Sequence, residues 1–134
     1  MEAPQRLPTI ARVTFIIHVI LAAVIGLLLL IIPSTFGDWF GYPSVPELEP
    51  PLRAFGAILL GLGGLTSLYG FLATSWERIA YIVHGEIAYL AIQTIVFLVS
   101  AIAGAGPALG NWIFTVISAV LLGLFVATFV TRPR

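Results

Sequence analysis

Apolar residues dominate four long stretches of the sequence, and polar residues gather between them. The stretches cover residues 13–32, 52–73, 79–103 and 112–130. Each is long enough to cross about 30 Å of hydrocarbon, which takes roughly 20 helical residues. Spanning β-strands would instead give alternating segments of about 10 residues, and the sequence has none. The pattern therefore predicts an all-α integral membrane protein built as a four-helix bundle.

The prolines mark the same boundaries as the apolar pattern. All nine lie outside the four stretches, where they do not interrupt a helix interior. Short connections between the later stretches make neighbouring helices antiparallel, so we expect one up-down domain over residues 1–134. The 33–51 connection is longer and is expected to form an outer loop. It carries several aromatic residues, so it is either a flap at the lipid headgroups or a docking surface or lid.

The composition indicates that most of the protein surface lies in lipid and not in water. Hydrophobic residues make up 60% of the chain and charged residues 9%, which is too little charge to cover the surface of a small soluble domain. The formal net charge is zero, so no basic field attracts nucleic acid. Cysteine is absent, which excludes disulfides and thiolate metal sites. We therefore expect the lipid bilayer as a partner, and neither nucleic acid nor a metal ion.

The arginines predict an orientation. Positive residues collect in the cytoplasmic loops of membrane proteins. Only Arg53, near Glu47 and Glu49, falls on the side of the 33–51 connection. We therefore expect a multi-pass protein of the cell (inner) membrane with both termini in the cytoplasm, and a first helix that is retained rather than cleaved as a signal peptide. The arginines on the side of the termini are Arg6, Arg12, Arg78, Arg132 and Arg134.

The second stretch is rich in small residues, which let helix backbones approach closely in lipid. It is therefore expected to be the central helix of the bundle. The same residues could serve packing within the chain, or self-association and docking to other membrane subunits. They are Gly56, Ala57, Gly61, Gly63, Gly64 and Ser67.

Polar side chains within the apolar stretches are candidates for a functional site, because they are costly in hydrocarbon. His18 lies six residues after Arg12, about 9 Å inward, and Glu86 lies about 12 Å inward on the third stretch. Gln93 follows Glu86 at seven-residue spacing, on the same helix face. We therefore expect a buried polar site of His18, Glu86 and Gln93, with His18 in contact with Glu86.

This site has several interpretations. It is a hydrogen-bonded clasp between helices, a site that handles protons or a small ligand such as a quinone, or a contact with another subunit. His18 and His84 lie at equal depth and could ligate haem or a pigment, although His84 points away from the face of Glu86. No other cofactor is expected. Arg53 is expected to bind Glu47 or Glu49, or to contact lipid phosphate or another anion at the outer face.

The first two predicted helices contain a recognisable pattern. It consists of the turn at Pro33, the outer loop and the run Leu52-Arg53-Ala54-Phe55-Gly56-Ala57. In this part the chain resembles small four-helix bacterial membrane proteins, the DoxX-like families and their uncharacterised relatives. The resemblance implies the topology alone.

The motifs of the common enzyme classes are absent from the sequence, including a phosphate loop, paired carboxylates and a catalytic triad. The sequence therefore favours a non-enzymatic protein, an accessory or assembly subunit of a larger membrane complex. The alternatives are a ligand-, quinone- or proton-handling protein that uses His18 and Glu86, and a b-type haem or pigment protein.

Overall fold

The computed structural model describes residues 7–133, and the regular structure within this range is entirely helical. The prediction of an all-α protein is confirmed. Four helices are long and apolar enough to cross a membrane: Thr9–Ile31, Pro46–Leu72, Trp76–Ala103 and Ala108–Val130. Each begins several residues earlier than its apolar stretch, because polar and proline residues occupy the first turns.

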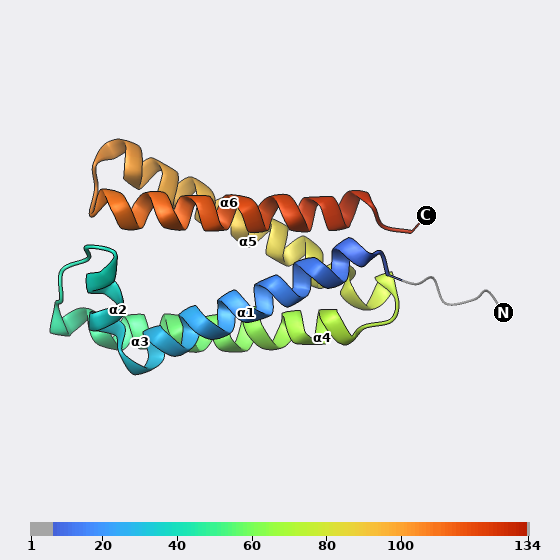
Figure 1. Ribbon diagram of the computed structural model, residues 1–134, viewed down its shortest axis with the longest axis horizontal. Coiled ribbons are helices and arrows are strands. Elements are labelled where there is room, and N and C mark those ends of the chain that lie inside the picture. The colour runs from blue at the N-terminus through green and yellow to red at the C-terminus, as the bar shows by residue number, and fades with distance from the viewer. Residues whose placement is uncertain (1–6, 134) are drawn as a thin grey trace.

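The long helices form two pairs that lie side by side along the molecule (Figure 1). α1 (Thr9–Ile31) runs along the second long helix, and α5 (Trp76–Ala103) runs along α6 (Ala108–Val130). Successive long helices run in opposite directions (Figure 1). The start of α1, the end of α6 and the α4–α5 connection lie at one end of the molecule, and we call the other end the α2 end (Figure 1).

The second long helix consists of four consecutive parts. A 3-10 turn, η1 (Pro46–Leu48), leads into α3 (Glu49–Ile58), which is followed by a π-helical segment, η2 (Leu59–Leu65), and α4 (Thr66–Leu72). A π-helical segment widens the helix by about one residue per turn and is often found at functional sites. The apolar pattern had not predicted it, although η2 contains three glycines.

The first long helix, and not the second as expected, is the central one. α1 packs against every part of the second long helix from α3 to α4, and also against α6. α5 packs mainly against α6 and meets α4 near the short turn that joins them. In the most apolar 18 residues of each helix, 33% of the residues are buried in α1 and 22% in the second long helix. The small residues of the second helix therefore let α1 pack closely against it.

The closest approach of α1 to α3 is at a pair of glycines. A Cβ atom added to Gly56 would lie 2.7 Å from the carbonyl oxygen of Gly26 and 2.9 Å from the amide nitrogen of Leu30. Backbone touches backbone here, so no larger residue fits without moving a helix. Nearer the start of α1, a Cβ atom added to Gly70 of α4 would lie 2.5 Å from the ring of Phe15.

The connection from residue 33 to residue 51 is more ordered than the expected loop. It contains α2 (Pro33–Trp39), η1 and the first turn of α3. Proline occupies the first positions of all three, where its missing N–H costs no hydrogen bond and its fixed φ favours a helix. Prolines that were interpreted as boundaries of a loop are thus the starts of helices.

Candidate functional site

All four long helices meet at His18. Its side chain is buried, and the residue is only 4% exposed. Nδ1 lies 2.7 Å from the hydroxyl oxygen of Ser67 on α4 and 3.8 Å from Oε1 of Glu86 on α5. The ring also stands edge-on to Phe125 of α6, with the centroids 5.4 Å apart. One imidazole on α1 therefore contacts the other three helices.

The hydrogen bond of His18 goes to Ser67 and not to Glu86. At 3.8 Å, Nδ1 of His18 and Oε1 of Glu86 are neighbours but too far apart for a hydrogen bond. Glu86 is buried, at 8% exposure. The structure thus brings His18 and Glu86 together, but the hydrogen-bonded clasp between helices joins α1 to α4. From its place among the small residues of the second stretch, Ser67 was expected only to allow close packing.

A cavity of about 300 Å³ extends from His18 to the α2 end. It lies between the two helix pairs, and α2 with the residues that follow it also lines it. Pro43, Ser44 and Leu48 line it too and are exposed, so it reaches the surface beside them. The inner lining residues are His18, Leu21, Ala22, Ile25, Tyr89, Leu90, Gln93, Ile117, Ser118 and Leu121.

The cavity has an apolar and uncharged lining. None of its lining residues is Asp, Glu, Lys or Arg. Gln93 lies in the wall, so the structure places it on the cavity side of α5, while Glu86 does not line the space. The hydroxyl of Ser118 is already used, because it donates to the carbonyl of Phe114 at 2.7 Å. His18, Gln93 and Tyr89 are therefore the main hydrogen-bonding groups of the inner part.

The segment after α2 closes this space against the start of α6. The phenol of Tyr42 donates a hydrogen bond to Oδ1 of Asn111, and Nδ2 of Asn111 donates to the carbonyl of Ala105. The ring of Tyr42 packs on Gly110, where an added Cβ would lie 2.5 Å from it. Burial raises the pKa of Tyr42 above its ordinary value, which keeps the phenol neutral and able to donate. The two residues are 69 positions apart, so no local sequence pattern indicated this contact.

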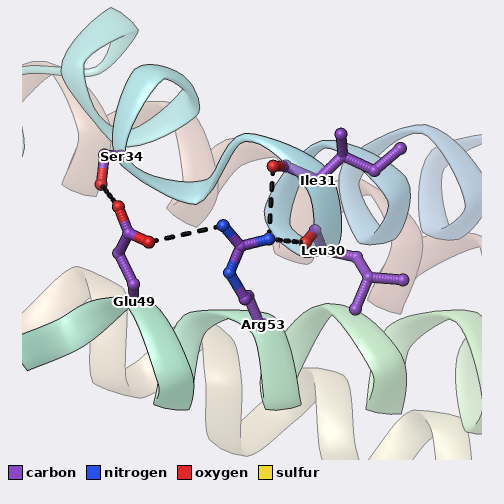
Figure 2. Close-up of polar contacts among 5 residues, drawn as sticks. All are labelled: Leu30, Ile31, Ser34, Glu49 and Arg53. Atoms are coloured by element: carbon purple, nitrogen blue, oxygen red, sulfur yellow. Dashed lines mark hydrogen bonds and ion pairs between the residues drawn. The ribbon is translucent and has the colours of Figure 1, made fainter. Parts of the chain in front are cut away.

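Arg53 holds α3 against the last turn of α1 (Figure 2). Its guanidinium donates to the carbonyls of Leu30 and Ile31, two groups that the end of α1 leaves without helical partners. It also lies 3.4 Å from Glu49, whose other oxygen accepts a hydrogen bond of 2.7 Å from Ser34 at the start of α2. The chain of contacts joins α1, α2 and α3 (Figure 2).

His84 lies apart from the buried site. It is exposed, its Nδ1 bonds the carbonyl of Ala80 in its own helix, and its ring stands edge-on to Phe129. The structure does not bring His84 and His18 to a common space, because His18 faces the interior of the bundle. Among residues 7–133, no group of three or more His, Asp or Glu side chains is placed to hold a metal ion.

No protein-family model matches the chain, and neither the curated proteins nor the solved structures include a similar one. The resemblance to the DoxX-like families is not tested by these comparisons and stays a prediction.

Proposed function

We propose that the four long helices cross a membrane as an up-down bundle, with the ends of the chain on the cytoplasmic side. The support is the distribution of charge over the structure. Arg12, Arg78 and Arg132 all lie at the end where α1 begins and α6 ends, whereas Arg53 is near the α2 end. Arg6 and Arg134, which belong to the same side in the sequence-based prediction, lie outside the described residues.

We further propose that the protein binds an apolar molecule in the cavity, in a binding and not a catalytic role. The cavity carries this proposal. Protein interiors pack as densely as organic crystals and leave few spaces larger than a water molecule, whereas this one has about 300 Å³. That volume lies in the range of small-molecule sites, which are mostly apolar with a few polar groups. His18 and Gln93 supply those groups here.

A bilayer supplies the ligands that such a site favours. Lipid-soluble molecules are concentrated around the helices of a membrane protein. When such a molecule enters an apolar cavity, no charge has to be buried, so no desolvation cost opposes binding. The exposed lining residues at the α2 end, such as Leu48, provide an opening near the level expected for the outer lipid headgroups. The 33–51 connection thus serves as a lid, one of the two roles that the sequence left open.

The test is a cavity-filling substitution with a matched control on the same helix. Ile117 lines the cavity, and Val120, three residues later, is exposed on the outer surface of α6. We expect purified wild-type protein to carry an apolar molecule near one-to-one stoichiometry, detected by solvent extraction and mass spectrometry. Ile117→Trp should lose it and Val120→Trp should keep it. Equal amounts in all three proteins would show that the molecule is bound elsewhere.

The accessory-subunit interpretation also stays a proposal. Of the small residues that suggested it, Gly56, Gly63 and Ser67 face α1 within the chain, so they give no separate support for a partner. Purification in mild detergent tests it, since a subunit would bring a stoichiometric partner protein with it.

A further inference from the structure

The hydroxyl of Ser67 determines which nitrogen of His18 carries the proton. Hydroxyls inside helices usually donate to the carbonyl four residues earlier, as Thr94, Thr115 and Ser118 do here. Ser67 has no such carbonyl partner among residues 7–133, and its oxygen lies 2.7 Å from Nδ1 of His18. Because the hydroxyl has no other acceptor among residues 7–133, we infer that its proton points at Nδ1, which accepts it. In a neutral imidazole the ring proton is then on Nε2.

Nε2 is a hydrogen-bond donor without a partner in the chain. None of the described residues accepts a bond from it. The same range contains no enclosed side-chain nitrogen or oxygen atom that lacks a partner, so Nε2 is accessible. His18 is nonetheless 4% exposed, and the space that it lines is the cavity. Nε2 lies on the side of Gly63, whose added Cβ would be 3.9 Å from it, so only a backbone without a side chain flanks it there. A buried N–H without a partner, in a residue that lines an apolar space, favours an acceptor brought by a ligand.

The residues that line the cavity restrict the charge of the acceptor group that a ligand can bring. No Asp, Glu, Lys or Arg side chain lines the cavity to neutralise a charged head group, and an unpaired charge is costly in an apolar space. A carboxylate or a phosphate is therefore a poor fit. An uncharged oxygen, such as a carbonyl, accepts from Nε2 without that cost, and the amide of Gln93 offers a second polar contact in the same space.

We propose that His18 donates a hydrogen bond from Nε2 to the carbonyl oxygen of an uncharged ligand with a hydrocarbon tail, the tail extending toward the α2 end. This inference rests on the ligand-binding function proposed above and names the chemical class of the ligand. Ser67 is the positioning residue, because it holds the ring and fixes its tautomer. Glu86 is a neighbour of the ring, with Oε1 3.8 Å from Nδ1, but it does not line the cavity and is given no role in binding the ligand.

Two probes of similar shape test this proposal. Decyl-1,4-benzoquinone and decylbenzene share a ring and a tail and differ in the two carbonyl oxygens. Binding of each to delipidated protein in detergent is measured by native mass spectrometry. A net hydrogen bond corresponds to about three- to tenfold in affinity, so we expect the quinone to bind by that factor more tightly. Decanoate, which has a charged head, should bind more weakly than both.

The variants assign the preference to His18. His18→Phe should bind the two probes equally while binding decylbenzene as wild type does, and His18→Gln should restore part of the preference, because an amide also donates. Ser67→Ala should reduce the preference without affecting decylbenzene, because the tautomer is no longer fixed. If His18→Phe does not fold, the wild-type probe comparison and Ser67→Ala still decide.

The outcomes separate the two proposals. Equal binding of the quinone and decylbenzene to wild type, or tightest binding of decanoate, would overturn the role of His18 and leave the apolar site intact. Failure of all three probes to bind, with no effect of Ile117→Trp, would overturn the ligand-binding function itself.

Discussion

The phenol of Tyr42 lies 3.0 Å from Oδ1 of Asn111 and donates a hydrogen bond to it across 69 positions of sequence. This bond joins the segment that follows α2 to the first turn of α6, so it connects the two helix pairs at the α2 end. The carbonyl of Phe40 and the ring of Tyr42 both pack on Gly110 beside it. The segment after α2 is thus bonded to and packed on the start of α6.

Gly110 should not tolerate a side chain. An added Cβ would lie 2.5 Å from the ring of Tyr42 and 3.0 Å from the carbonyl oxygen of Phe40. We expect Gly110→Ala to lower the free energy of unfolding by about 1–3 kcal/mol, the usual range for overpacking. Gly123→Ala, on the same helix with nothing within 4 Å of its added Cβ, should be neutral or stabilising by up to about 1 kcal/mol. Denaturant unfolding in detergent measures both, and equal effects would refute the packing of Tyr42 on Gly110.

Tyr42 should give the stability of the protein a dependence on alkaline pH. Burial raises the pKa of the phenol above the ordinary value of 10.0, so the folded state holds the proton more tightly than the unfolded state does. This contribution is fully present below pH 10 and is lost as the pH rises through the folded pKa. Tyr42→Phe should cost about 1 kcal/mol at neutral pH, and its difference from wild type should shrink at higher pH. A difference that is constant with pH would count against this.

The glycine contact between α1 and α3 should be the most sensitive point of the helix interface. Gly56→Ala places a methyl group against the backbone of α1, and we expect the free energy of unfolding to fall by about 2–3 kcal/mol. Gly61→Ala is the control on the same long helix, with open space around its Cβ, and it should not lower the stability of the monomer. A changed oligomeric state in Gly61→Ala would instead reveal self-association through this face.

Arg53 should stabilise the protein through the carbonyls at the end of α1 more than through its ion pair. The pair with Glu49 is exposed, and such pairs contribute little. We expect Arg53→Leu to lower the free energy of unfolding by about 1 kcal/mol, and Arg53→Lys to recover only part, because an ammonium lacks the planar fork. Glu49→Gln should have a smaller effect than Arg53→Leu. Equal effects would show that the ion pair dominates.

The orientation can be read by chemical labelling, because the chain has no native cysteine. Thr35 on α2 and Thr74 in the α4–α5 connection are both exposed. In intact cells, a membrane-impermeant maleimide should label Thr35→Cys directly and Thr74→Cys only after the membrane is permeabilised. The reverse pattern would place the ends of the chain outside.

Sequence reasoning identified the helices because hydropathy and proline positions act locally. It also paired His18 with Glu86 on depth and helix face, and the structure places them 3.8 Å apart. It missed Ser67 as the hydrogen-bond partner, since a serine among glycines on a helix also fits close packing. The central position of α1, the π-helical segment and the Tyr42–Asn111 bond depend on how distant segments pack, and no local pattern encodes them.

The two helix pairs touch mainly where α1 meets α6 and where α4 meets α5, and a connection of three residues, 73–75, joins them. The cavity lies between the two helix pairs, so its volume depends on how the pairs are placed relative to each other. A ligand bound there, as proposed above, would act as a spacer between the pairs. Binding inside the membrane would then change the position of residues 33–48 at the surface, where another molecule could detect whether the site is filled.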